Sequence, residues 1–401
     1  MKNIVFVVGN YKNGGVAMRS TNLANEFAKA GYHCTILVTK EISKDVFFEH
    51  HQNVDIVLLS DYVSCHSTDK AVIKNQNKRY FRIRILKYLR YISKFFPNLD
   101  KKLAEEIKGL RHTEDISIFI ANHPNCTYIP FGVEYFENTF YGTYGIKSKI
   151  IYAECNPPEL EFPADPQEKE LLFDKFRKID GAVLQTEDEL KFFNGILKKS
   201  AVIYNPLKPN LPEPFSGKRQ KIVVNFCRLS RQKNIPMMIN AFVEFHKEYP
   251  DYSLEIYGNT VTNNEDILRE QLNQMIVSLN ADKFIKILPP RSDIHDVVRD
   301  YAMFVSSSDF EGLSNSMIEA MAIGLPCVCT DCLGGGAREM IKDGENGLLV
   351  PINDVKSLCD AMKKMASDEN FANKCSENAA KIKKQLSVNK IADKWLKVIE
   401  L

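Results

Sequence analysis

The chain has 401 residues, more than one hydrophobic core usually serves, so two domains are expected. Its 44% apolar and 26% charged residues are ordinary for a globular protein, and a formal net charge of +2 confines any nucleic-acid contact to a local patch. Ten cysteines in so long a chain exclude a small disulfide scaffold, and neither a signal peptide nor a membrane-spanning run is evident, which predicts a reduced, cytoplasmic protein.

Short apolar, β-branched runs alternate with amphipathic stretches along the first half, the pattern of βα units on a parallel sheet. A helix is expected between the first two runs, with Leu23, Phe27 and Ala30 on its apolar face and Gly31 at its carboxyl end. The expected strands of this half are 3–8, 33–39, 54–60, 116–121, 149–153, 181–186 and 201–205.

Near residue 206 the amino-acid composition changes. The segment "NPLKPNLPEPFSGKRQ" carries four prolines and is typical of a linker between domains. A second βα series follows it, with expected strands at 221–227, 253–258, 284–288, 302–307, 326–330 and 347–351. We expect an amino-terminal domain over 1–207, a carboxyl-terminal domain over 208–385 and a last helix over 386–401. Two doubly wound α/β domains would place a ligand cleft between the carboxyl ends of their sheets.

The segment "GNYKNGG" (9–15) lies between the first expected strand and the first expected helix. Its glycines would let the backbone approach a phosphate or a sugar at the helix N-terminus. A plain tight turn is the alternative. The segment is not GxGxxG, and no acidic residue follows the second strand to bind a ribose, so an oxidoreductase is poorly supported.

A basic loop, "CRLSRQKN" (227–234), follows the opening strand of the second half. Arg228, Arg231 and Lys233 crowd this loop at the edge of the expected cleft. An arginine fork and a lysine point charge are the side chains that a diphosphate needs. The alternative is a solvated basic loop.

Two acids, Glu311 and Glu319, flank a strand-to-helix turn in "DFEGLSNSMIEAMA". Ser314 or Asn315 is expected to cap the helix, whose free N–H groups favour anions. Carboxylates beside an anion site are explained by a ligand that also carries hydroxyl groups, because a carboxylate accepts hydrogen bonds from a diol. A nucleotide-sugar has both parts; cations and amides would neutralise its diphosphate and leave the acids free to bind hydroxyls. A helix-surface glutamate is the alternative for Glu319.

These motifs together resemble the retaining glycosyltransferases of the GT-B fold, the group 1 family that includes bacterial capsule, O-antigen and lipid-linked glycan sugar transferases. The resemblance covers nearly the whole chain and is densest over 221–352. The glutamates at 311 and 319 match the family pair with seven residues between them, and "RLSRQKN" matches its Arg-Leu-x-x-x-Lys segment. The run "EAMAIGLPCVCTDCLGGGAREMIKDGENGLLVP" matches the long signature that begins at the second glutamate.

The resemblance implies a role for each matching residue. Arg228 and Lys233 would hold the donor diphosphate, Glu319 would bind the ribose diol, and Glu311 would contact the transferred sugar as a catalytic residue. The other expected donor-binding residues supply close backbone approach or amides: Gly14, Gly15, Gly258, Gly312, Leu313, Ser314 and Asn315. The base is expected to be read near 288–293.

His123, in "ANHP", matches the family's catalytic cleft histidine, because it follows the strand expected over 116–121. Taken alone, a histidine before proline is more often structural. Cys227 departs from the family pattern, which often has glycine at that place.

A basic, aromatic-rich stretch, "KNQNKRYFRIRILKYLRYISK" (74–94), contains no acid, and its apolar residues fall at helical spacing. We expect either peripheral contact with an anionic membrane or a domain helix with a solvated basic face. Nucleic acid has no supporting motif here.

No metal site is expected. Cys327 and Cys329 alternate along a strand, so they point to opposite faces, and no zinc-type pair follows Cys332. Buried thiols explain them better. No cofactor is expected.

The expected function is therefore transfer of a hexosyl unit from a nucleotide diphosphate sugar to a hydroxyl of a glycan or polyprenyl-linked acceptor in cell-surface polysaccharide synthesis. Family frequency favours UDP, and the resemblance implies a retaining, metal-independent enzyme in the cytoplasm, on the inner face of the membrane if 74–94 binds there. The alternatives are a nucleotide-sugar epimerase of related fold and a non-catalytic two-domain sugar-binding protein. A glycan phosphorylase would need a pyridoxal lysine, for which no candidate is evident.

Overall fold

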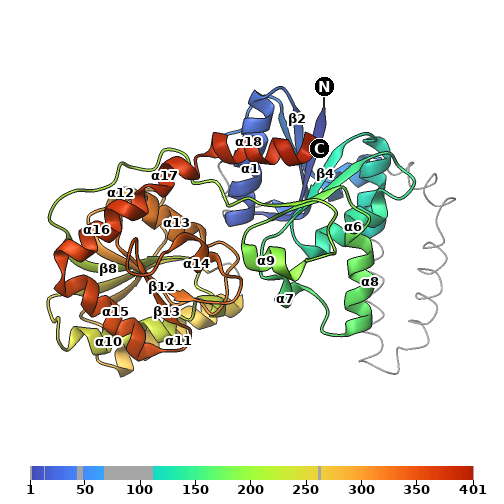
Figure 1. Cartoon of the computed structure of the whole chain (residues 1–401). Helices are drawn as coiled ribbons and strands as arrows, with labels where there is room; N and C mark the ends of the chain where they lie inside the picture. The colour runs from blue at the N-terminus through green and yellow to red at the C-terminus, as the bar shows by residue number, and fades with distance from the viewer. Residues whose placement is uncertain (1, 13, 43–47, 67–111, 261–262, 401) are drawn as a thin grey trace, which may run out of the picture.

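The computed structural model of the chain describes residues 2–12, 14–42, 48–66, 112–260 and 263–400. Two parallel sheets, each covered by helices, lie in the two halves of the chain (Figure 1). The expected architecture of two Rossmann-like domains is confirmed.

The first sheet has seven strands in the order β3-β2-β1-β4-β5-β6-β7, and every pairing is parallel. Residues 4–8 of β1 are all buried, because helices cover both faces of this sheet. The strands are β1 (Asn3–Tyr11), β2 (His33–Ile42), β3 (Val54–Leu58), β4 (Thr127–Pro130), β5 (Lys149–Ala153), β6 (Gly181–Leu184) and β7 (Ser200–Val202). The helices are α1 (Gly15–Lys29), α2 (Leu59–Cys65), α6 (Val133–Gly142), α7 (Pro158–Glu161), α8 (Pro166–Phe176) and α9 (Glu187–Phe192), and residues 112–122 are also helical.

The second sheet has six parallel strands in the order β10-β9-β8-β11-β12-β13. Its strands are β8 (Gln220–Phe226), β9 (Ser253–Tyr257), β10 (Ile285–Leu288), β11 (Tyr301–Ser306), β12 (Cys327–Asp331) and β13 (Leu348–Pro351). The helices are the 3-10 turn η2 (Arg231–Lys233), α10 (Ile235–His246), α11 (Asn263–Ser278), α12 (Ile294–Val298), α13 (Asn315–Ala322), α14 (Gly336–Met340), α15 (Val355–Ser367), α16 (Glu369–Ala380), α17 (Ile382–Gln385) and α18 (Val388–Glu400).

The strand expected over 116–121 is wrong, because these residues lie in the helix over 112–122. The true neighbour of β1 is β4, a four-residue strand that the sequence did not single out. A short apolar run fits a buried helix as well as a strand, which explains the error.

The proline-rich segment joins β7 to β8 and packs closely. Leu207 and Leu211 are buried, and the Leu207 N–H donates to the Leu386 carbonyl at 2.9 Å. After α17 the chain returns to the first half, where α18 lies beside α1 (Figure 1). Trp395 of α18 is fully buried, with the guanidinium of Arg19 5.4 Å from its ring centre.

Each sheet has a point at which the strand order reverses, between β1 and β4 in the first and between β8 and β11 in the second. Ligands bind outside the carboxyl ends of the strands at such points. The loops after β1, β4, β8 and β11 therefore define the region to search for a site.

Candidate functional site

Glu311 lies on the loop between β11 and α13, and its side chain is only 13% exposed. Lys233 forms an ion pair with its Oε1, to which the Ser308 hydroxyl also donates at 2.9 Å. Gln232 Nε2 donates to Oε2 at 3.2 Å. A carboxylate accepts about four hydrogen bonds, so one acceptor position is left for a guest. The expectation of a free carboxylate is wrong here, because the acid is held in place by the basic loop.

Lys233 ends the turn η2, and its side chain is 15% exposed. Burial, the largest single influence, lowers its pKa, but attraction to Glu311 and Cys227 and the hydrogen bond to Glu311 together outweigh it, so the pKa is raised overall and the ammonium stays charged. Arg228 is different, because its side chain is 53% exposed and its Nε lies 3.3 Å from Glu265 Oε1. The basic loop thus carries one largely buried, paired cation, Lys233, and two exposed arginines, Arg228 and Arg231.

Glu319 lies within α13 and is 8% exposed. Its Oε2 lies 2.9 Å from Nε2 of His295, a buried residue of α12. Glu319 is therefore not the free helix-surface residue of the alternative interpretation. His295 carries no sequence motif and stands 24 positions from Glu319, so it was not predicted as a site residue.

Closely packed glycines support the Glu311 loop from beneath, in the turn between β12 and α14. A Cβ on Gly336 would lie 1.8 Å from the Gly312 carbonyl oxygen, and one on Gly334 would lie 2.0 Å from that of Glu311. Gly334 also has a φ of +95°, which side chains disfavour. Only glycine fits here, so the glycines within the downstream signature hold the backbone of the Glu311 loop.

Two buried side chains from the first half of the chain form hydrogen bonds with the loop that carries Glu311. Gln185 Oε1 accepts the Leu313 N–H at 3.1 Å, and Gln185 Nε2 donates to Asn205 Oδ1 at 2.8 Å. Asn205 Nδ2 in turn lies 3.3 Å from the Leu313 carbonyl and 3.0 Å from Asn315 Oδ1. The Leu313 N–H is therefore already hydrogen-bonded within the protein and is not available to the donor. This corrects the expectation that its backbone amide binds the donor. We call Gln185 and Asn205 the cross-domain clamp.

Gly14, Gly15 and Gly258, which were predicted to bind the donor, lie at the carboxyl edges of the two sheets. A Cβ on Gly15 would lie 2.7 Å from Asn315 Nδ2, so the amino-terminal turn meets the start of α13. Gly14 is the N-cap of α1. A Cβ on Gly258 would lie 2.3 Å from the Cys227 carbonyl, which places Gly258 under the basic loop. Ser314 is the N-cap residue of α13, but its hydroxyl lies 3.2 Å from that of Ser316 and does not cap the helix.

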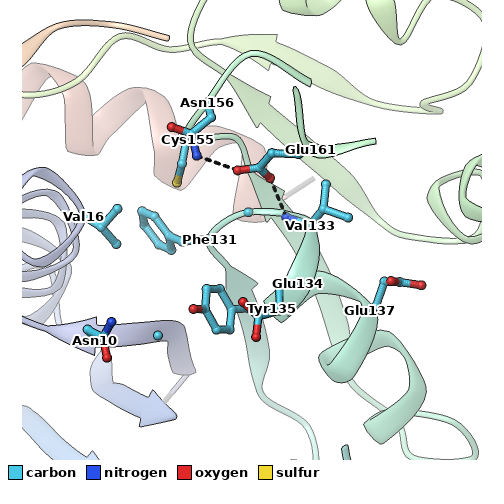
Figure 2. Close-up of a pocket in the computed structure, with 12 residues that line it drawn as sticks. Asn10, Val16, Phe131, Val133, Glu134, Tyr135, Glu137, Cys155, Asn156 and Glu161 are labelled. Atoms are coloured by element: carbon cyan, nitrogen blue, oxygen red, sulfur yellow. Dashed lines mark hydrogen bonds between the residues drawn. The ribbon is translucent and has the colours of Figure 1, made fainter. Parts of the chain in front are cut away.

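A pocket of about 630 Å³ opens at the carboxyl ends of β1, β4 and β5 (Figure 2). Glu161 crosses it, accepting the Val133 N–H at 2.9 Å and the Asn156 side-chain amide at 2.6 Å. The other lining residues are Gly9, Asn10, Val16, Phe131, Gly132, Glu134, Tyr135, Glu137 and Cys155. No sequence motif pointed to this pocket apart from its neighbour, the 9–15 turn.

His123 lies at the opposite edge of the first sheet. It lines a second pocket with Asn3, His33 and Asp55, which stand at or near the amino ends of β1, β2 and β3. Its ring stacks on Phe119 at 4.1 Å, and Nδ1 lies 2.8 Å from the Phe119 carbonyl oxygen. His123 follows a helix and precedes β4, whereas a cleft residue must follow a strand. The structure thus places His123 at the amino edge of the first sheet, away from the carboxyl edge where the cleft is expected, and contradicts its role as a cleft histidine.

Residues 210–382, which contain the basic loop, both glutamates and the glycine turn, match the family model described as glycosyl transferases group 1. Over this segment the chain is similar to the group 1 glycosyltransferases. The chain is 26% identical over 359 residues to a Campylobacter jejuni protein named N-acetylgalactosamine-N,N'-diacetylbacillosaminyl-diphospho-undecaprenol 4-alpha-N-acetylgalactosaminyltransferase, covering 86% of this chain and 91% of that one. It is 28% identical over 221 residues to a Streptomyces coelicolor exopolysaccharide phosphotransferase, covering 54% of this chain but only 23% of that protein.

Solved GT-B glycosyltransferases have the same fold. The Anabaena protein HepE, solved in complex with UDP, superposes with a TM-score of 0.74 at 16% identity, covering 100% of both chains. TarM superposes with a TM-score of 0.73 at 15% identity, covering 99% of this chain and 98% of that chain. At such identities the likeness establishes the GT-B fold of this chain and nothing finer.

Two of the sequence expectations concern membranes and metals. The basic stretch 74–94 lies outside the described residues, and within the described part of the chain no helix is long and apolar enough to cross a bilayer. Cys327, Cys329 and Cys332 are buried free thiols, and burial raises the pKa of Cys332 to about 12.

Proposed function

We propose that this chain is a group 1 glycosyltransferase that transfers a hexosyl unit from a UDP-sugar to a hydroxyl of a glycan or lipid-linked acceptor during cell-surface polysaccharide synthesis, with retention of anomeric configuration. The observation that carries the proposal is the buried pairing of Lys233 with Glu311 at the carboxyl edge of the second sheet. The name of the Campylobacter relative and the UDP bound to HepE support the acceptor class and the nucleotide.

The donor diphosphate would meet Lys233 and the exposed Arg228. Lys233 is held beside Glu311, so its charge is preorganised at the position where the diphosphate arrives. The exposed Arg228 would exchange its contact with Glu265 for a forked contact with the diphosphate. Glu319, fixed by His295, would bind the ribose diol with the acceptor positions that this contact leaves open.

In the transfer step, the bond between the anomeric carbon and the diphosphate oxygen breaks, and a bond from that carbon to the acceptor oxygen forms. The bonding electrons leave with the diphosphate, where Lys233 and Arg228 offset the developing charge. The acceptor proton passes to the departing diphosphate. Glu311, beside the transferred sugar, would use its remaining acceptor position to orient a sugar hydroxyl.

We propose further that the reaction needs neither a metal ion nor a cofactor, because two cations serve the diphosphate. Turnover that survives exhaustive treatment with EDTA is the expected result. Loss of turnover that returns on adding Mg²⁺ or Mn²⁺ would overturn this part of the proposal.

The experiment that tests the function incubates the purified chain with UDP-, GDP- and ADP-sugars, with and without a lipid extract, and follows nucleotide release and product anomer. We expect UDP release that depends on the acceptor and a product with the donor's anomeric configuration. Free sugar released without acceptor would instead indicate an epimerase. Binding without any release would indicate a sugar-binding protein.

The basic stretch 74–94 is the proposed contact with an anionic membrane. Sedimentation with vesicles of phosphatidylglycerol should retain the full chain at low salt, and vesicles of phosphatidylcholine should not. Equal recovery with both vesicle types would contradict this placement.

A further inference from the structure

The pocket shown in Figure 2 opens beside the loop that would hold the donor. Val16, which lines it, follows the Gly15 whose hypothetical Cβ would lie 2.7 Å from Asn315. On another wall, the carbonyl oxygen of Cys155 lies 3.1 Å from the position of a Cβ on Gly312. A molecule in this pocket therefore lies next to residues 312–315 of the second half.

The charge of the pocket lining has one sign. Glu134, Glu137 and Glu161 line it, and its described lining contains no lysine, arginine or histidine. Two lysines that do not line the pocket form ion pairs with these glutamates: Lys40 with Glu134 at 3.0 Å, and Lys175 with Glu137.

A buried cation, Arg19, lies behind the Phe131 wall, 5.2 Å from that ring's centre, but it does not line the pocket and donates to the Glu154 carbonyl instead. Glu161 has no ion-pair partner among the described residues, so a phosphate beside its carboxylate would meet repulsion.

The other lining groups suit a sugar. Glu161 is fixed by two hydrogen bonds and keeps acceptor capacity, and the side chains of Asn10 and Asn156 are exposed to the pocket's solvent. Tyr135 packs its hydroxyl against Gly9, where an added Cβ would lie 1.9 Å away. Carboxylate, amide and phenol groups beside apolar Val16 are groups that form hydrogen bonds with sugar hydroxyls.

We propose that this pocket binds the uncharged, hydroxyl-rich end of a glycan acceptor and rejects an acceptor whose end is a polyol phosphate. The inference rests on the proposed function, since the bound hydroxyl is the one that attacks the anomeric carbon. It adds the acceptor's charge class, which the family and fold leave open.

The first test offers the full chain, with its UDP-sugar donor, neutral oligosaccharides and glycerol-phosphate oligomers of similar length. Neutral oligosaccharides should accept the sugar with a KM that changes less than about twofold between low and high salt, because screening does not affect an uncharged ligand. Transfer to glycerol-phosphate oligomers, with a KM that rises steeply with salt, would overturn the proposal. Binding of only the phosphate probe in calorimetry would overturn it too.

The second test changes the pocket. Glu161→Gln should raise the KM for the neutral acceptor about tenfold while the affinity for UDP stays at the wild-type value, because a charged hydrogen bond to the sugar is lost. The matched control is Glu170→Gln on α8, an exposed carboxylate paired with Arg177, which should leave both values unchanged. An unchanged acceptor KM in Glu161→Gln would contradict the proposal.

Glu161 also supports the start of α6, so a charge test that spares it is needed. Glu134 is 57% exposed, and Glu134→Lys should be tolerated in the fold. At low salt this variant should bind glycerol-phosphate oligomers at least about fivefold more tightly than the wild type. No gain in binding would count against the proposal. UDP affinity, measured in parallel, separates failure of the proposed function from failure of the acceptor proposal. If the chain does not bind UDP, the proposed function is refuted. If it binds UDP, the acceptor result decides the proposal about the pocket.

Discussion

The side-chain oxygen of Gln185 accepts the backbone N–H of Leu313 at 3.1 Å, although the two residues stand 128 positions apart. Gln185 follows β6 of the first sheet, and Leu313 lies between the two glutamates of the second half. Because both residues are buried, this bond ties the conformation of the donor loop to the relative position of the two halves.

Replacing Gln185 should therefore impair donor binding without direct contact with the donor. In Gln185→Leu the Leu313 N–H loses its acceptor, and a buried unpaired donor costs about 1–3 kcal/mol. We expect a donor KM raised about tenfold and a modest fall in melting temperature. Steady-state kinetics with the UDP-sugar and thermal unfolding measure both.

A purely structural role for Gln185 would lower stability and leave the donor KM of the folded fraction unchanged. The exposed Gln274 on α11 provides the matched control, and Gln274→Leu should change neither quantity. Loss of stability with a wild-type donor KM would contradict the role assigned to the clamp.

Glu319 should make binding sensitive to the ribose hydroxyls. If its carboxylate holds the ribose diol, the wild type binds UDP more tightly than 2′-deoxy-UDP, by about tenfold or more. Glu319→Ala should remove this preference, bringing the two dissociation constants within about twofold. Calorimetry with both nucleotides measures the ratio, and an undiminished preference in the variant would refute the assignment.

Glu189 predicts how stability depends on pH. It is 1% exposed on α9, accepts the Gln185 N–H at 2.5 Å, and burial raises its pKa from 4.5 to about 8. The folded state therefore keeps this proton over a range in which the unfolded state has lost it, so stability falls as the pH rises from about 4.5 to 8.

Glu189→Gln keeps a hydrogen-bond acceptor for Gln185 but cannot ionise. Compared with the wild type, the variant should have similar stability near pH 4.5 and greater stability near pH 8.5, by ~5 kcal/mol at most. Urea unfolding across this pH range measures the difference. Parallel loss of stability in both proteins would show that Glu189 does not cause the dependence.

The second half of the fold follows closely from sequence pattern. Its six expected strands coincide with β8 to β13 within a few residues, because fully buried parallel strands appear as continuous apolar runs. The spacing of Glu311 and Glu319 also places one on the loop and the other in α13, as expected, since Gly312 ends regular structure between them.

Long-range partners were not predictable. Gln185, Asn205 and His295 carry no local signal, and only the fold brings them to the Glu311 loop or to Glu319. His123 was misplaced because an apolar run was interpreted as a strand when it is a helix, which moves the next residue to the opposite edge of the sheet. The binding roles of the donor-site residues stay predictions that the experiments above address.

The central claim is that the buried Lys233 binds a nucleotide diphosphate sugar, and its most direct test is UDP-sugar turnover by Lys233→Ala. The control is Lys221→Ala, an exposed lysine paired with Asp251 at the other end of β8. Removing one preorganised donor should lower turnover by about 100-fold or more and weaken UDP binding, while the control stays within about twofold. Wild-type turnover and UDP affinity in Lys233→Ala would contradict the account.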